Sequence, residues 1–149
     1  MRFQTTIQRN KETIYKLLID LQGYRSWLPS SEMYSETCDI SESPAKVGTT
    51  YRDQGKASVM QGRVIELEPG QRITFAQEMK RKIAGIPSRL EIRACYTLKS
   101  SGEFSTQVTR ELTIKAQGIF LLLQPLLLGG IRKENERIMQ RLKWYLEAR

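Results

Sequence analysis

The sequence contains no histidine among its 149 residues. Histidine is the commonest general base and the commonest metal ligand in proteins, so its absence excludes Ser-His-Asp and Cys-His catalytic arrangements. Any catalysis would have to use carboxylates, tyrosines, lysines or ordered water. The chemistry open to this chain is therefore narrow.

Cysteine is also scarce, because only Cys38 and Cys95 are present and their spacing resembles neither a metal site nor a redox pair. Residues 1–8 alternate like a strand and lack the apolar core of a signal peptide. Gly129-Gly130 has neither the lysine nor the preceding strand of a phosphate-binding loop. We therefore expect a cytoplasmic protein with reduced thiols, and with neither a metal ion nor a cofactor.

A transmembrane span is not expected either. The most apolar stretch, residues 118–131, is shorter than the roughly twenty residues that a bilayer requires, and Gln124, Pro125 and Gly129-Gly130 interrupt it. Proline removes a backbone donor and glycine weakens a helix, so a kink or a break is expected near these positions. Such a helix either acts as a lid or simply follows a curved sheet, and the sequence leaves both open.

The length fits one domain, residues 1–149. Lysine and arginine outnumber aspartate and glutamate by 24 to 16, a formal charge of +8. The excess is dispersed, and its densest cluster, residues 80–82 followed by Arg89 and Arg93, is typical of a solvated loop and strand face. Nucleic acid is therefore not the expected partner. The sequence leaves both a monomer and a homodimer open.

The pattern along the chain predicts one strand, two short helices, six more strands and a long helix. Phe3, Thr5 and Ile7 alternate in the first strand, Asn10 caps a helix that Gly23 ends, and a second short turn covers residues 24–28. The later strands are predicted at residues 33–40, 47–54, 57–66, 72–80, 89–99 and 104–115, with a loop at 83–87.

The last helix carries an apolar stripe at Ile131, Ile138, Met139, Leu142, Tyr145 and Leu146. Asn135 lies within the stripe, either as a buried amide bonded to a neighbouring backbone or as a donor that faces a ligand. Trp144 lies among the charges and is predicted to pack on a neighbouring loop. The element order predicts an α+β fold, in which a seven-stranded curved antiparallel sheet wraps around the carboxyl-terminal helix and leaves a space for a ligand.

Several segments together resemble the START-like, Bet v 1-like (SRPBCC) superfamily, and within it the bacterial polyketide cyclase/dehydrase and lipid-transport group. The resemblance covers the full length and is carried by residues 24–29 (YRSWLP), 47–49 (VGT), 64–70 (VIELEPG), 125–128 (PLLL) and 142–147 (LKWYLE). It implies a helix-grip fold with a deep cavity, whose members bind lipids, sterols, quinones or polyketides. A minority of the members are enzymes, and no catalytic motif can be carried over to this chain.

Strand and helix parity predicts which side chains line the cavity. The expected ligand-binding residues are Trp27, Phe75, Leu90, Ile92, Tyr96, Val108, Arg110, Leu112, Ile131, Asn135, Ile138 and Leu142. Leu17 and Ile73 are also expected to point inward. Arg110 cannot lose its charge, so it requires either a carboxylate, Glu78 or Glu91, or a ligand anion. Glu91 is the less favoured of the two, because alternation along the strand places it on the opposite face of the sheet from Leu90.

Three functions remain open from the sequence. The first is a carrier or sensor of a small hydrophobic molecule, such as a lipid, polyketide or quinone-like compound. The second is a cyclase or dehydratase that uses Tyr96, Arg110 and Asn135 without metal or histidine. The third is an interaction protein that associates with the ribosome or RNA. A carrier needs a cavity lined by apolar side chains with one or two polar groups that bind the ligand, whereas an enzyme needs several polar groups that converge on one point of the cavity.

Overall fold

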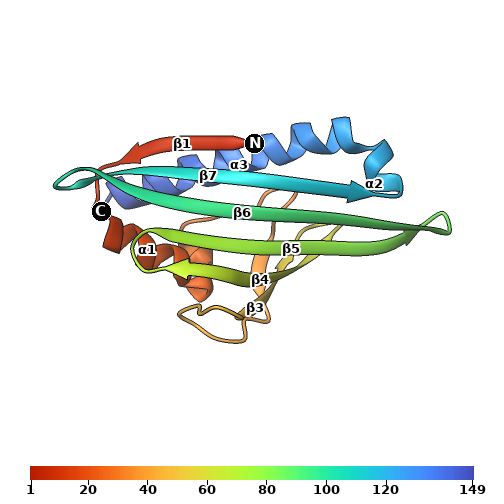
Figure 1. Cartoon of the computed structure of the whole chain (residues 1–149), viewed down its shortest axis with the longest axis horizontal. Helices are drawn as coiled ribbons and strands as arrows, with labels where there is room; N and C mark the ends of the chain where they lie inside the picture. The colour runs from red at the N-terminus through yellow and green to blue at the C-terminus, as the bar shows by residue number, and fades with distance from the viewer.

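The computed structural model describes residues 1–149 as one curved antiparallel sheet beside a long carboxyl-terminal helix (Figure 1). In chain order the elements are β1 (Arg2–Ile7), α1 (Lys11–Ile19), the 3₁₀ helix η1 (Leu21–Ser26), β2 (Glu36–Cys38), β3 (Thr50–Gln54), β4 (Val59–Glu68), β5 (Arg72–Ile83), β6 (Ile86–Gly102), β7 (Ser105–Gln117), α2 (Ile119–Leu122) and α3 (Gln124–Glu147). The seven strands lie in the order β1-β7-β6-β5-β4-β3-β2. The predicted α+β, helix-grip architecture is confirmed.

The first helix begins where the sequence predicts. Asn10 Oδ1 accepts a hydrogen bond from Thr13 N at 2.9 Å, which satisfies one of the free amides of the first turn. The helix ends at Ile19, before the predicted stop at Gly23. Asp20 Oδ1 instead accepts a hydrogen bond from Gly23 N at 3.2 Å and so caps η1, which places Gly23 inside that turn of 3₁₀ helix.

The hairpin of β5 and β6 is longer than predicted. The sequence predicts a loop over residues 83–87, but the two strands pair until Ile83 meets Ile86. Only Ala84 and Gly85 remain in the turn, both with positive φ, 51° and 78°. Two such residues are what a tight hairpin turn requires, so the ladder continues to its limit.

The predicted strand at residues 33–40 is mostly wrong, since only β2 joins the sheet. The preceding segment turns toward α3 instead. Ser31 Oγ donates a hydrogen bond to Glu134 Oε2 of α3 at 3.0 Å, and Tyr34 is buried. Before β2, only Ser35 N still donates a backbone hydrogen bond to β3, at Gln54, while Ser31 contacts the helix.

The apolar stretch before α3 is broken at Leu123, between α2 and α3. Pro125 lies in the first turn of α3, where its missing N–H has no partner to lose. The predicted break thus falls beside Pro125, whereas α3 passes through Gly129-Gly130 without interruption. None of the helices is both long enough and apolar enough to cross a membrane.

The core lies where the second half of α3 packs on β1, β6 and β7. Leu142 is fully buried, as are Ile7, Leu18 and Val108 in the same cluster. Trp144 is 67% exposed, so the prediction that it packs on a loop is wrong. Its position among charged residues of the helix places it on the solvent side of α3.

We expect Leu142→Ala to lower the free energy of unfolding by about 2 to 4 kcal/mol, because it removes buried methyl groups and leaves a cavity under the helix. Trp144→Ala on the same helix serves as the control and should stay within about 0.5 kcal/mol of the wild type. Urea denaturation of the three proteins measures both effects. Equal stability of all three would mean that α3 does not pack through Leu142.

Candidate functional site

A cavity of about 240 Å³ lies between the inner face of the sheet and α3. Of its 25 lining residues, 18 are hydrophobic. The wall is rich in aromatic rings from η1 and the strands, and these rings make edge contacts with one another, as Phe75 does with Tyr51 and Tyr96. A mostly apolar cavity with few polar groups is typical of a small-molecule site, and its volume is just below the roughly 300 Å³ at which such sites usually begin.

Most of the predicted site residues meet in this cavity. Its wall includes Trp27, Phe75, Leu90, Ile92, Tyr96, Arg110, Leu112, Ile131, Asn135 and Ile138. Val108 and Leu142 are fully buried but lie outside the cavity wall. Val108 pairs with Thr5 and Leu98, near the start of β7, where Figure 1 places the end of α3 close to the sheet. Helix and sheet pack directly there, so both residues belong to the core.

The inward residues Leu17 and Ile73 also pack in the core and do not line the cavity. Whether the ten lining residues contact a ligand stays a prediction. The parity on which they were chosen is confirmed, because Leu90, Ala94, Tyr96, Leu98 and Leu112 are all buried. Alternation along β6 and β7 therefore located the cavity wall, but it could not separate the wall from the core.

Arg110 places a permanent charge in the wall. Its Nε donates a hydrogen bond to Asn135 Oδ1 at 2.7 Å, and its guanidinium carbon lies 4.8 Å from the centroid of the Tyr96 ring. Asn135 Nδ2 in turn donates to the carbonyl of Ile131 at 2.8 Å. Asn135 is thus a buried amide bonded to the backbone of its own helix, the first of the two predicted roles, and it also holds Arg110.

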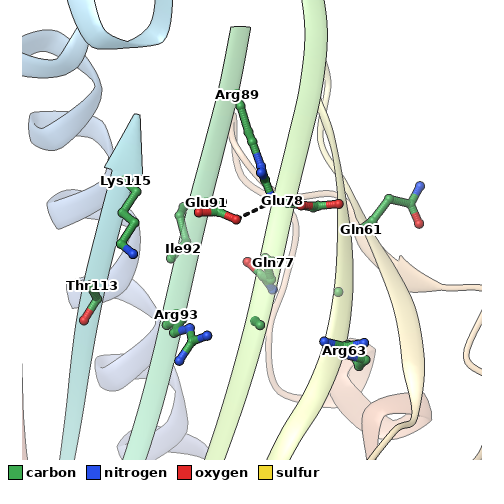
Figure 2. A pocket seen from close by; sticks show the side chains of 12 residues that line it. Gln61, Arg63, Gln77, Glu78, Arg89, Glu91, Ile92, Arg93, Thr113 and Lys115 are labelled. Atoms are coloured by element: carbon green, nitrogen blue, oxygen red, sulfur yellow. Dashed lines mark hydrogen bonds and ion pairs between the residues drawn. The ribbon is translucent and has the colours of Figure 1, made fainter. Parts of the chain in front are cut away.

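The carboxylates expected to neutralise Arg110 lie elsewhere. Glu78 and Glu91 are directly opposite each other on β5 and β6, and both form ion pairs with Arg89. Figure 2 shows these three side chains in a second hollow of about 440 Å³, on the face of the sheet away from α3. Only two of the 12 residues that line this hollow are hydrophobic. The expectation that Glu78 or Glu91 meets Arg110 is therefore wrong.

No carboxylate forms an ion pair with Arg110. Strand parity explains why, since Glu78 and Glu91 share the outer face with Arg89, whereas Arg110 pairs with Tyr96 on the inner face. Its only hydrogen bond is the one from Nε to Asn135. The two terminal nitrogens of the guanidinium are therefore left without a protein acceptor.

A second polar group in the wall centres on Asp53, which the sequence reasoning missed. Asp53 Oδ1 accepts a hydrogen bond from Thr37 Oγ1 and Oδ2 accepts one from Gln77 Nε2, both at 2.7 Å. Gln77 Nε2 also donates to the hydroxyl of Tyr51 at 3.0 Å, and the hydroxyl of Tyr34 lies 2.8 Å from Thr37 Oγ1. The sequence did contain a signal for Asp53, because alternation along β3 places it on the same face of the strand as Tyr51.

Burial raises the pKa of Asp53 to about 6, and the hydrogen bonds from Thr37 and Gln77 and the charge of Arg110 only partly oppose the effect. Burial also raises the pKa values of Tyr24 and Tyr51, so both phenols are neutral near pH 7. The indole Nε1 of Trp27 is buried without a hydrogen-bond partner. The wall of the cavity thus contains one fixed cation, Arg110, one carboxyl group with a pKa of about 6, Asp53, and a second carboxylate, Glu134, which forms an ion pair with Arg137.

Known structures match the whole chain. A START superfamily protein from Mycobacterium smegmatis is 14% identical, with a TM-score of 0.72 over 99% of this chain and 97% of that one. The chain therefore has the START-like fold. The Zhui aromatase/cyclase from Streptomyces sp. R1128 is 15% identical, with a TM-score of 0.73 over 99% of this chain and 92% of that one.

The Aha1 dimer from Colwellia psychrerythraea is 17% identical to this START-like chain, with a TM-score of 0.62 over 99% of this chain and 95% of that one. No protein-family model matches the chain, and no curated protein matches it. Identities this low indicate a shared fold, and a shared fold by itself does not assign an activity. The function has to be argued from the cavity.

The raised pKa of Asp53 makes stability depend on pH. Between its ordinary pKa of 3.8 and its folded value of about 6, the folded protein binds more protons than the unfolded chain, so the free energy of unfolding falls as pH rises through this window. We expect the wild type to lose about 2 to 3 kcal/mol relative to Asp53→Asn between about pH 4 and pH 7. Urea denaturation across this range measures the difference, and parallel curves for the two proteins would contradict it.

Proposed function

We propose that this protein binds a small hydrophobic molecule that carries one acidic group, as a carrier or a sensor. The observation that carries the proposal is Arg110, a permanent cation in an apolar wall without a carboxylate partner. Arg110 is half-buried and its two terminal nitrogens have no protein acceptor, so its charge is partly withdrawn from water and gains from an opposite charge or from further hydrogen bonds. An acidic group on the ligand would supply both.

The geometry around Arg110 suits a carboxylate. Asn135 Oδ1 accepts the hydrogen bond from Arg110 Nε, and the guanidinium lies over the ring of Tyr96. These two contacts restrain the Arg110 side chain before any ligand binds. The two terminal nitrogens can then donate to both oxygens of a carboxylate, the bidentate pairing that arginine forms best. The apolar part of the ligand would lie against the rings and aliphatic side chains of the wall.

A second candidate function is a cyclase or dehydratase-type enzyme. It rests on Asp53, whose pKa near 6 suits a general base or acid, and which shares the cavity wall with Arg110. The Zhui aromatase/cyclase has the same fold. Of the trio expected from the sequence, Asn135 is already bonded at both polar atoms, so Asp53 is the better catalytic candidate. A carrier would need Arg110, whereas an enzyme would also need Asp53.

The third function considered, association with RNA, receives less support. The basic residues of the sheet's outer face are partly neutralised there, because Arg89 pairs with both Glu78 and Glu91. Nucleic acid binding requires a continuous surface of uncompensated cations that follow the phosphate backbone.

We expect a medium-chain fatty acid or an anionic environment-sensitive dye to bind saturably at one site per chain, because the cavity is single, mostly apolar and cationic at one point. Fluorescence titration measures the stoichiometry, and the fatty acid should displace the dye. Failure of every apolar probe to bind would contradict the proposed function.

Arg110→Met should weaken a carboxylic acid ligand by about 10-fold to 100-fold, the value of one charge-assisted interaction, and leave its methyl ester within about 3-fold. Stability should hold within about 1 kcal/mol, because the change strands no buried carboxylate. Arg93→Met, an exposed arginine on the outer face, is the matched control. A loss of stability of about 3 to 5 kcal/mol with unchanged acid selectivity would instead make Arg110 a structural residue.

A further inference from the structure

Four leucines at the junction of α2 and α3 are exposed to solvent. Leu121, Leu122, Leu123 and Leu126 are 56%, 76%, 43% and 77% exposed, respectively, and we call them the leucine ridge. Single exposed leucines are ordinary, but a group this close along the chain forms a contiguous apolar patch. Such patches mark surfaces that become covered by a membrane or by another protein.

The ridge is held outward by its neighbours. Phe120, which precedes it, is buried, and Ile119 N donates a hydrogen bond to Ser88 Oγ at 2.9 Å. Gly118 turns the chain with a φ of 66°, so close to β6 that a Cβ atom there would lie 2.3 Å from the carbonyl oxygen of Pro87. Because Phe120 anchors the short helix α2 on the sheet, the leucines after it are presented by an ordered segment.

The ridge continues into the wall of the cavity. Leu127 comes directly after Leu126 and lines the cavity, as does Ile131 one turn further along α3. Met33 also lines the cavity and is 44% exposed, and its sulfur lies beside Gly130 of α3. Apolar side chains therefore run from the outer surface of the protein to its interior at this end of α3.

Basic residues surround the ridge. Its base packs on Pro87 and Ser88, whose partners across the hairpin are Lys82 and Arg81. Lys80, Arg81, Lys82 and Arg89 line a hollow of about 430 Å³ on this hairpin. On α3, Lys133 comes seven residues after Leu126, two turns along the same helical face. Neither Lys82 nor Lys133 forms an ion pair, so both charges are free to meet an anionic partner.

We propose that the leucine ridge and these flanking cations form a docking surface for a bilayer that contains anionic phospholipid. The leucines enter the interfacial layer while Lys82 and Lys133 contact the headgroups, and the rim of the cavity then faces the membrane. This proposal rests on the proposed function, because it supplies the route by which an apolar cargo would enter or leave. A second copy of the chain fits less well, since pairing two ridges would bring cations together on chains that each carry a charge of +8.

Vesicle co-sedimentation tests the surface. We expect the wild type to bind vesicles of phosphatidylcholine and phosphatidylglycerol, and to bind pure phosphatidylcholine at least about 10-fold more weakly. The double variant Leu122→Asp/Leu126→Asp should lose at least about 10-fold in binding to the mixed vesicles. Leu122→Ser/Leu126→Ser, which adds no charge, should lose binding in the same direction, and Lys82→Gln/Lys133→Gln should weaken binding only to the anionic vesicles.

Phe104→Asp is the matched control, because Phe104 is 67% exposed and lies in the turn before β7, at the opposite end of that strand from α2. It should change binding by less than about 2-fold, since the residue lies away from the proposed surface. Equal binding of the ridge variants and the wild type, or equal binding to both kinds of vesicle, would overturn the proposal. So would a dimer at micromolar concentration that the ridge variants dissociate, because a second copy would then be the occupant.

Titration of the anionic dye without vesicles separates this proposal from the proposed function. The ridge variants should keep the dye affinity of the wild type, because their side chains lie outside the cavity wall. Arg110→Met should bind mixed vesicles normally while losing acid selectivity. Failure of the dye to bind alongside normal vesicle binding would defeat the cavity function alone, and the reverse pattern would defeat the docking surface alone.

Discussion

Arg110 carries a charge that it cannot lose, on the inner face of β7 between the apolar side chains of Val108 and Leu112. The protein meets this constraint only in part, by one hydrogen bond that Arg110 Nε donates to Asn135 and by the ring of Tyr96. Both of those residues depend on the rest of the fold, because Asn135 comes from α3 and Tyr96 from β6. The arrangement exists only when the helix is seated on the sheet.

Apart from Ser58 and from Glu134, which pairs with Arg137, the polar residues of the cavity wall form two separate sets. One contains Arg110 and Asn135, on β7 and α3, and the other contains Thr37, Asp53 and Gln77, on β2, β3 and β5. Asp53 forms no ion pair with Arg110, although the arginine charge lowers the pKa of its carboxyl group. Had the two groups met, each would have neutralised the other. Their separation leaves a cationic point and a titratable point in an otherwise apolar wall.

The sequence predicted most of the fold, because β6 and β7 alternate over long stretches and α3 has a clear apolar stripe. It placed ten cavity residues correctly on the wall but included Val108 and Leu142, which are core residues. Periodicity reports which way a side chain points and not how closely the opposing element approaches. Asp53 was missed because its role depends on Thr37 and Gln77, which only the register of four strands, β2 to β5, brings together.

The strand predicted at residues 33–40 is reduced to β2, for a related reason. In the segment before β2, Ser31 and Tyr34 make their contacts with α3 and with side chains of the cavity wall. Local propensity cannot anticipate a partner that lies about a hundred positions later in the chain.

The hydrogen bond between Arg110 and Asn135 joins the sheet to α3 inside the cavity. The same amide group of Asn135 reaches back to the carbonyl of Ile131, one turn nearer to the leucine ridge. Two consecutive hydrogen bonds therefore join the guanidinium to the backbone of α3 at Ile131, five residues after Leu126. The cation that would meet an acidic ligand is thus tied to the same helix on which the leucine ridge ends, so the position of Arg110 and the seating of α3 depend on each other.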